Sequence, residues 1–152
     1  MRLRHLVIAA LCVIATACIG HRYPYTAFTQ LRPDGWAYGD TLTFDVRLTD
    51  SVTRGDMLID ITHDNSYPYS NLWLEITHRA DSATVARDTV AVTLCDPIGK
   101  WYGRGIEGLY QLETPLKEDI LLTDSTTITI RHIMRLDTIR GLSRIGLTFR
   151  SL

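Results

Sequence analysis

Cys18 is the residue whose surroundings point to a specific covalent reaction. It ends the run Ala15-Thr16-Ala17-Cys18, and small residues before a cysteine are typical of a bacterial lipobox. Small side chains suit a narrow peptidase cleft, and the thiol is the side chain that accepts a diacylglyceryl group as a thioether. We therefore predict that Cys18 becomes the acylated first residue of the mature protein and anchors it to a membrane. Apart from this covalent lipid, we expect no cofactor.

The residues before Cys18 have the design of a secretory signal. Arg2 and Arg4 give a positive start, and the 11 residues from Leu6 to Thr16 are almost wholly apolar. That run is too short to cross a bilayer, which takes about 20 residues. We predict a signal peptide over residues 1–17. The alternative is a soluble secreted protein that is cut near Ala17.

The other cysteines predict a domain without an internal disulfide. The chain has three cysteines, of which Cys12 leaves with the signal and Cys18 carries lipid. Cys95 then remains alone, so the fold must rest on its hydrophobic core. We expect Cys95 to be a small buried apolar residue, because reactive cysteines need a basic setting and none is evident around it.

The remaining polar residues form no catalytic or metal-binding pattern. Lys100 follows Gly99 directly, without the spacing or the helix of a phosphate-binding loop. No pair of histidines has a recurring ligand spacing. The net charge of -1 argues against a nucleic-acid binder, which needs a basic face. We therefore predict no catalytic residue, no metal site and no nucleic-acid partner.

Two segments carry the residues most suited to binding another molecule. In the first, Tyr67 and Tyr69 flank Pro68, which stiffens the chain, and Trp73 follows. Tyrosines in a loop offer a partner apolar area and a hydroxyl group at low entropic cost. They also fill protein cores, and the sequence leaves both roles open for Tyr67 and Tyr69.

The second segment runs from Asp96 to Gly105 and is rich in glycine, aromatic and basic residues. One interpretation is a plain long loop whose glycines permit positive φ. We favour a recognition loop, because long loops on rigid sandwiches often bind partners. Its predicted partner-facing residues are Lys100, Trp101, Tyr102 and Arg104.

Alternating apolar and polar residues predict the elements that position these segments. The alternation has a period close to 2 from residue 41 onward, and many short strands at close spacing favour an all-β fold. We predict one antiparallel β-sandwich, jelly-roll-like, over residues 41–152, after a lipidated N-terminus and leader over residues 18–40. The predicted strands are 42–48, 57–63, 72–77, 89–94, 109–116 interrupted at Pro115, 127–134 and 145–149, with a polar turn over 50–55 and an edge strand over 25–31.

A charge bias marks the end of the chain. Residues 125–152 contain five arginines and one acidic residue, Asp137. The arginines could be a solvated strand face or edge protection. They could also form a docking face for an acidic partner or for lipid headgroups.

Four pieces of the sequence, in order, resemble one protein family along nearly the whole chain. They are the lipobox at Cys18, the segment Asn65 to Leu74, Gly99-Lys100-Trp101-Tyr102-Gly103 followed by Gly105, and His132-Ile133-Met134-Arg135 followed by Gly141. Together they resemble the gliding motility lipoproteins of the GldH family. This resemblance implies a non-enzymatic lipoprotein of the cell envelope that is needed for gliding motility. It also implies partners among the envelope proteins of that machinery, which is shared with type IX secretion.

Two further expectations concern location and an alternative function. No acidic run follows Cys18. In relatives whose lipoproteins reach the cell surface such a run acts as an export tag, so we expect the domain to face the periplasm. The alternative function is a carbohydrate-binding module for peptidoglycan or another glycan, since sandwiches with exposed Trp and Tyr often stack on sugar rings.

Overall fold

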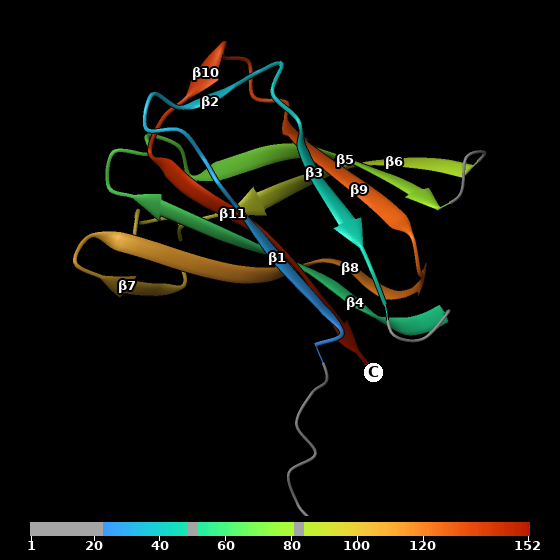
Figure 1. Ribbon diagram of the computed structural model, residues 1–152. Coiled ribbons are helices and arrows are strands. Elements are labelled where there is room, and N and C mark those ends of the chain that lie inside the picture. Colours follow the sequence, from blue (N-terminus) through green and yellow to red (C-terminus); the bar gives the residue numbers. More distant parts are fainter. Residues whose placement is uncertain (1–22, 49–51, 81–83) are drawn as a thin grey trace, which may run out of the picture.

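The structure, a computed structural model, describes residues 23–48, 52–80 and 84–152. Cys18 and the predicted signal peptide lie outside the described residues. None of the residues in these ranges belongs to a helix long and apolar enough to cross a membrane. The strands (Figure 1) are β1 (Tyr25–Gln30), β2 (Trp36–Ala37), β3 (Leu42–Val46), β4 (Val52–Asp64), β5 (Asn71–Ala80), β6 (Thr84–Thr93), β7 (Arg104–Ile106), β8 (Leu109–Thr123), β9 (Thr126–His132), β10 (Thr138–Ile139) and β11 (Leu142–Ser151).

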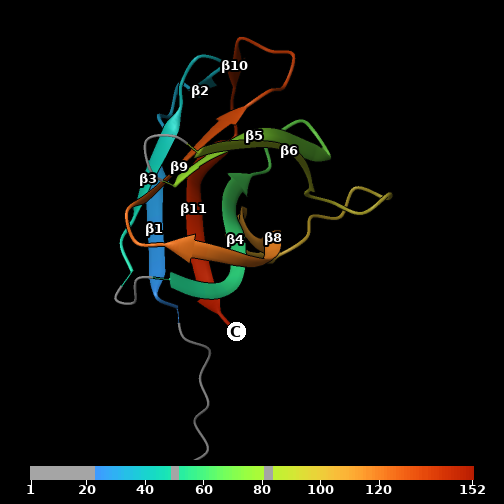
Figure 2. The same cartoon turned by 90° about the vertical axis from the view of Figure 1, so that its right-hand side faces the viewer.

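The strands form two packed antiparallel sheets, which confirms the predicted sandwich. A five-stranded sheet has the order β1-β11-β4-β8-β7, and a four-stranded sheet has the order β3-β9-β5-β6. A two-stranded ribbon of β10 and β2 lies above them at one end (Figures 1 and 2). For comparison with known topologies, the strands of five or more residues are numbered again from one to eight along the described chain. In order, they are β1, β3, β4, β5, β6, β8, β9 and β11. The large sheet is then 1-8-3-6, followed by β7, and the small sheet is 2-7-4-5. This is the strand order of a jelly roll.

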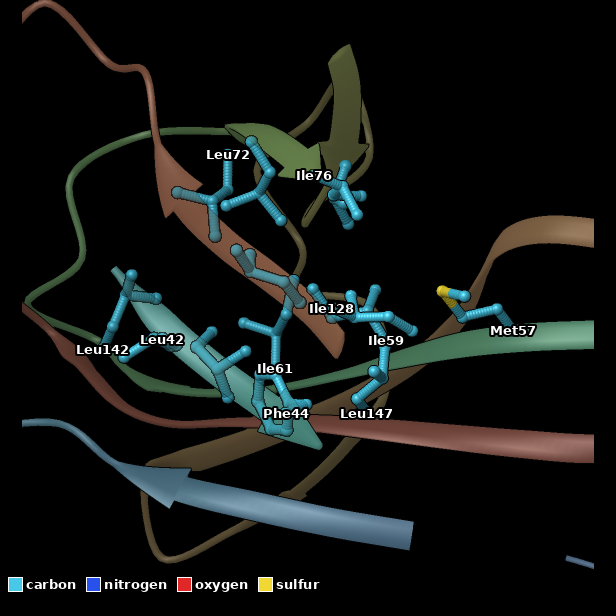
Figure 3. Close-up of a cluster of buried hydrophobic side chains, with 14 of the residues drawn as sticks. Leu42, Phe44, Met57, Ile59, Ile61, Leu72, Ile76, Ile128, Leu142 and Leu147 are labelled. Carbon is cyan, nitrogen blue, oxygen red and sulfur yellow. The ribbon is translucent and has the colours of Figure 1, made fainter. Parts of the chain in front are cut away.

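The core lies between the two sheets and follows from the alternation in the sequence. In β3 and β9 every second residue is buried, and its neighbours point to the other face. Ile59 and Ile61 of β4 face Leu72 of β5 and Ile128 of β9 across the gap between the sheets, and all four are fully buried (Figure 3). Each buried aliphatic side chain of this kind contributes about 1.5–3 kcal/mol relative to its exposed form.

The leader predicted for residues 18–40 contributes to this fold. β1 pairs with β11 over its whole length, with Tyr25 opposite Phe149 and Gln30 opposite Arg144. Trp36 of β2 is 1% exposed and belongs to the core cluster. Its indole Nε1 donates a hydrogen bond to the backbone oxygen of Asp40 at 2.9 Å. The sheets therefore include residues before position 41.

Strands β4 and β8 are longer than the sequence predicted. The strand expected to break at Pro115 runs on to Thr123, because Pro115 lies opposite Leu58 where the register of β4 and β8 shifts. Such an irregularity tolerates a residue that has no N–H to donate. The predicted polar turn over residues 50–55 is wrong for its described part, since β4 begins at Val52.

Candidate functional site

Four aromatic rings from three distant parts of the chain pack together at one end of the sandwich. His63 lies near the end of β4, Tyr67 follows β4, Trp101 lies in the loop after β6, and Tyr110 lies near the start of β8. The His63 ring is 4.5 Å from that of Trp101, 5.5 Å from that of Tyr110 and 5.9 Å from that of Tyr67, centroid to centroid. Aromatic pairs at such separations add about 0.5–1.5 kcal/mol beyond their buried area. We call these four residues the aromatic cluster.

Tyr67 belongs to the core. Its side chain is 1% exposed, and its hydroxyl donates a hydrogen bond to the backbone oxygen of Asn71 at 2.7 Å. Burial raises the pKa of the Tyr67 hydroxyl above its usual range. A Cβ on Gly141 would lie 2.4 Å from the backbone nitrogen of Tyr67, so only glycine lets the chain pass there. Of the two roles that the sequence leaves open for Tyr67, the structure shows packing.

Trp101 joins the two predicted binding segments. Its Nε1 donates a hydrogen bond to Oδ1 of Asn65 at 3.1 Å, and its backbone forms an antiparallel bridge with Cys95. Nearby, the backbone nitrogen of Leu94 donates to the oxygen of Ser70 at 2.8 Å. Cys95 is a buried free thiol, as predicted. Segments 65–71 and 94–102 therefore form one ordered unit.

Asp96 holds the turn that precedes Trp101. Its Oδ1 accepts hydrogen bonds from the backbone nitrogens of Ile98 at 3.0 Å and Lys100 at 2.8 Å. The Asp96 nitrogen in turn donates to the oxygen of Lys100 at 2.9 Å. Gly99 adopts φ of 86°, which L residues avoid. The aspartate side chain thus closes the turn in the manner typical of Asx turns.

A surface of exposed apolar and basic side chains lies on this unit, and we call it the loop-end surface. The tip of the Asp96 turn presents Ile98, which is 88% exposed, and the hairpin between β7 and β8 presents Ile106 at 75%. The hairpin turns through Glu107 and Gly108, which both have positive φ, as a two-residue turn requires. The surface comprises Ile98, Lys100, Tyr102, Arg104, Ile106 and Leu109, all exposed.

Three of these six residues are predicted binding residues and three were missed. Lys100, Tyr102 and Arg104 are exposed as expected, with Tyr102 at 43%. Ile98 lies in the predicted recognition loop, whereas Ile106 and Leu109 carry no sequence signal of exposure. In the sequence, an apolar residue beside a two-residue turn looks the same as an apolar residue on a buried strand. Only the shortness of the hairpin indicates that it is exposed.

A polar hollow of about 380 Å³ adjoins this surface, on the outer face of the large sheet. Arg104 and Glu113 line it, together with Asp60 and Gln111. Asp60 is only 4% exposed, and its carboxylate accepts hydrogen bonds from Nε2 of Gln111 at 2.9 and 3.1 Å. The hollow therefore offers both charges and a fixed amide to a polar group.

The remaining predicted binding residues lie apart from the loop-end surface. Tyr69 is half-buried, with its ring edge-on to that of Tyr67 at 5.7 Å. Trp73 is 42% exposed on the outer face of the small sheet. Its backbone oxygen accepts a hydrogen bond from the nitrogen of Ile133 at 2.9 Å, and its nitrogen lies 3.4 Å from the sulfur of Met134. The structure places Trp73 beside the His132–Arg135 segment.

His63 is the fully buried member at the centre of the aromatic cluster. Its side chain is fully buried, and burial lowers its pKa below the ordinary value of 6.5. Nδ1 lies 3.1 Å from the backbone oxygen of Asp64, so the proton sits on Nδ1 and is donated to that carbonyl. No group of three His, Cys, Asp or Glu side chains in the described ranges is arranged to hold a metal ion.

Three of the five C-terminal arginines form ion pairs with carboxylates of the described residues. Arg131 donates to Glu75 at 2.8 Å, and Arg150 donates to Asp56 at 2.8 Å. Arg144 lies 3.9 Å from Asp60. These pairs support the interpretation of the arginines as parts of the sheet faces, since their charges are balanced within the domain.

The described residues thus define a jelly-roll domain with a packed aromatic cluster at one end and an exposed apolar and basic surface over it. The chain belongs to the GldH lipoprotein family, whose match covers residues 23–149. The family resemblance seen in the sequence is therefore confirmed.

Two relatives are named as gliding motility proteins. The gliding motility lipoprotein GldH of Flavobacterium johnsoniae is 22% identical over 118 residues, which are 73% of this chain and 74% of that protein. A GldH homolog of Christiangramia forsetii is 28% identical over 102 residues, which are 66% of this chain and 63% of that protein. Their names describe lipoproteins and not enzymes, and the family indicates a membrane-anchored protein of the cell envelope with a part in gliding motility.

Solved structures give more distant matches. Dimeric latent PorU of Porphyromonas gingivalis matches over 90% of this chain and 13% of its own, with 15% identity and a TM-score of 0.36. A likeness at this TM-score does not define a shared fold, and it carries no functional information.

Proposed function

We propose that this protein is a non-catalytic, lipid-anchored component of the gliding motility and type IX secretion apparatus that acts by binding other envelope proteins. The acyl groups on Cys18 hold it at the membrane, and the domain faces the periplasm. Family membership supports the setting. The loop-end surface supports the mode of action, because it displays exposed apolar side chains on an ordered base.

The single observation that carries this proposal is the combination of exposure and order at the loop end. Exposed apolar side chains scattered over a surface need no explanation. Here Ile98 lies on the Asp96 turn, Ile106 lies at the β7–β8 hairpin and Tyr102 lies between them in the chain, and Asp96 and the aromatic cluster fix the adjoining backbone. A preordered apolar surface loses little entropy on binding, which is the property that protein interfaces favour.

The basic residues and the polar hollow indicate which chemical groups a partner would present. Lys100 and Arg104 flank the apolar residues, and Arg104 also lines the hollow that contains Asp60. A partner with an acidic group for Lys100 and Arg104, and with a polar group for the hollow, would satisfy both features. Interfaces of this kind have an apolar centre and a charged rim.

Crosslinking from intact envelopes tests the proposal. A strain that produces the Tyr102→Ala, Ile98→Asn protein should lose the crosslinked envelope partners, together with gliding and secretion, while the protein level stays normal. The matched control is Thr43→Ala with Thr129→Ala on the outer face of the small sheet, which should leave all three readouts unchanged. Wild-type crosslinking, motility and secretion in the loop-end variant would contradict the proposal.

Trp73 favours a second candidate, the carbohydrate-binding module. This side chain is 42% exposed on a polar sheet face, where Arg131 and Glu75 form an ion pair at 2.8 Å. Sugar rings stack on exposed indoles, and neighbouring polar groups bind their hydroxyls. Titration with peptidoglycan fragments and other glycans should change Trp73 fluorescence if this candidate holds, and Trp73→Phe should abolish the response. Trp101 is a poorer platform, because its ring already packs on His63.

A further inference from the structure

A second exposed apolar surface lies at the opposite end of the large sheet, beside the point where the chain leaves the domain toward Cys18. It consists of Tyr23, Val52, Leu121 and Leu152, which are 55%, 53%, 63% and 76% exposed. We call these four residues the linker-end patch. Tyr23 lies five residues after Cys18 in the sequence and two residues before β1 begins.

Strand pairing brings Val52, Leu121 and Leu152 to neighbouring positions at the start of β4. Arg54 of β4 lies opposite Leu121 of β8, and Val52 is two residues along the same strand. The backbone nitrogen of Leu152 donates to the oxygen of Arg54 at 3.2 Å on the other side of β4. Both chain ends of the domain lie at this end, close to the start of β4 (Figures 1 and 2).

The register of β1, β11 and β4 shows which residues lie at each end of the large sheet. Tyr25 is level with Phe149 and Met57, whereas Gln30 is level with Arg144 and Thr62. β1 therefore runs from the linker-end patch toward the loop-end surface, and its five steps of about 3.3 Å cover roughly 17 Å. The aromatic cluster lies beyond that point, because His63 and Asp64 follow Thr62 on β4.

The acylated residue cannot lie far from the patch. Five Cα-to-Cα steps separate Cys18 from Tyr23, and at 3.8 Å each they span at most about 19 Å. Acyl chains in a bilayer thus keep the linker-end patch at the membrane surface, while the loop-end surface is a further length of sheet away. An exposed apolar patch held beside the lipid headgroups lowers its free energy by entering the interface, where tyrosine is a favoured residue.

We propose that the linker-end patch is a membrane-contacting surface, which holds the domain against the bilayer and points the loop-end surface away from it. This inference rests on the proposed acylation of Cys18. Among the described residues, the cations beside the patch are Arg54 and Arg150, and carboxylates neutralise both, so the contact made by the described part of the chain is apolar in character. Arg54 binds Asp119 with its Nη2 2.6 Å from Oδ2, and Arg150 binds Asp56 at 2.8 Å. Binding should therefore depend little on the charge of the lipid headgroups or on salt.

Depth-dependent fluorescence quenching tests the orientation. The full acylated protein, with Cys95→Ser, is reconstituted into vesicles of phosphatidylethanolamine and phosphatidylglycerol that contain nitroxide-labelled lipid. One environment-sensitive fluorophore is attached through Leu121→Cys or, as the matched control, through Ile106→Cys. Both positions are exposed and apolar, so labelling should preserve the fold. We expect quenching at position 121 to exceed that at position 106 several-fold, and equal or reversed quenching would overturn the proposal.

Variants and lipid composition separate this inference from the proposed function. Val52→Asn with Leu152→Asn should lower quenching at position 121 at least two-fold, whereas Ile98→Asn with Leu109→Asn should leave it unchanged. Replacing the anionic lipid with phosphatidylcholine should also leave it unchanged. If quenching is absent while the linker-end variant loses crosslinked partners, the patch binds protein and the membrane contact is refuted. Loss of partners in the loop-end variant alone supports the proposed function independently of quenching.

Discussion

The two ends of the large sheet both expose apolar side chains, but they hold them in different ways. At the loop end, the exposed residues sit over rings that pack at 4.5–5.9 Å and over an aspartate that fixes a turn. At the linker end, they sit on the strands β4 and β8 and beside the ends of β1 and β11, next to surface ion pairs such as Arg54–Asp119. Surface ion pairs contribute only about 0–1 kcal/mol each. The difference fits the two proposed roles, since a partner surface gains from an ordered base and a membrane contact needs only to be apolar.

The largest expected effect comes from removing the buried Tyr67 ring of the aromatic cluster. Tyr67→Ala removes a fully buried ring and leaves the Asn71 oxygen without its donor, so it should lower the free energy of unfolding by about 3–5 kcal/mol. Urea unfolding of the domain from residue 19 onward measures this change. Tyr102→Ala is the matched control, since it deletes an exposed tyrosine of the same end and should cost under about 0.5 kcal/mol. Similar losses in the two variants would contradict the core position of Tyr67.

Protonation of the buried histidine in the cluster should give the next effect. Burial lowers the folded-state pKa of His63 below 6.5, so the unfolded chain binds more protons as the pH falls through that value. The stability that depends on unprotonated His63 is fully present above about pH 6.5 and is lost as the pH falls toward the folded-state pKa. Over that range the free energy of unfolding falls by at most about 1.4 kcal/mol per pH unit. His132 and His78, whose pKa values burial also lowers, add slopes of the same sign.

Unfolding free energies measured between pH 8 and pH 5 test this expectation. His63→Gln should remove from the slope the part that corresponds to the uptake of roughly one proton on unfolding. This holds whatever the effect of the substitution on stability at pH 8. The carboxyl groups of Asp56, Glu75 and Asp119 have lowered pKa values because arginines donate hydrogen bonds to them, so their contribution is lost only at more acidic pH. An unchanged slope in His63→Gln would mean that the pKa of His63 is the same in the folded and unfolded states.

Loss of the Asp96 side chain should loosen the loop end while leaving the core intact. Asp96→Ala removes two hydrogen bonds to backbone nitrogens, with an expected loss of about 1–2 kcal/mol. Hydrogen exchange should accelerate at the amides of Ile98 and Lys100 well before any change in the amides of β4. Asp137→Ala, an exposed aspartate near the β10 ribbon, is the control. Uniform acceleration through both sheets would show that the turn is not an independent feature.

Much of the fold was predictable because alternation reports directly which face a residue takes. In β3 the inward residues Leu42, Phe44 and Val46 are all buried, as their spacing predicts. The bulge that carries β8 through Pro115 depends on the register of β4, which is set by pairing between distant segments. The break predicted there was wrong for that reason.

The candidate site was predictable only in part. The sequence marked both aromatic segments, but not their union through Asn65 and Trp101, which are 36 residues apart. The burial of Tyr67 depends on Gly141, a close approach between parts of the chain that no local pattern reveals. Exposure of Ile106 at a hairpin tip breaks the rule that apolar residues of a strand face inward, and such breaks are expected where a protein binds another molecule.

Substitutions on the two exposed surfaces should have the smallest effects on stability, and they should distinguish the roles of the two surfaces most clearly. Ile98→Asn with Ile106→Asn at the loop end, and Val52→Asn with Leu121→Asn at the linker end, all replace side chains that are at least half exposed. Each pair should change the free energy of unfolding by under about 1 kcal/mol. In whole cells the first pair should abolish partner crosslinking, while the second should leave crosslinking measurable but less efficient, because a tilted domain presents its loops poorly. If both pairs abolished crosslinking equally, the two ends would form one continuous partner interface. If neither did, partners would bind elsewhere, and the exposed face around Trp73 would be the next surface to test.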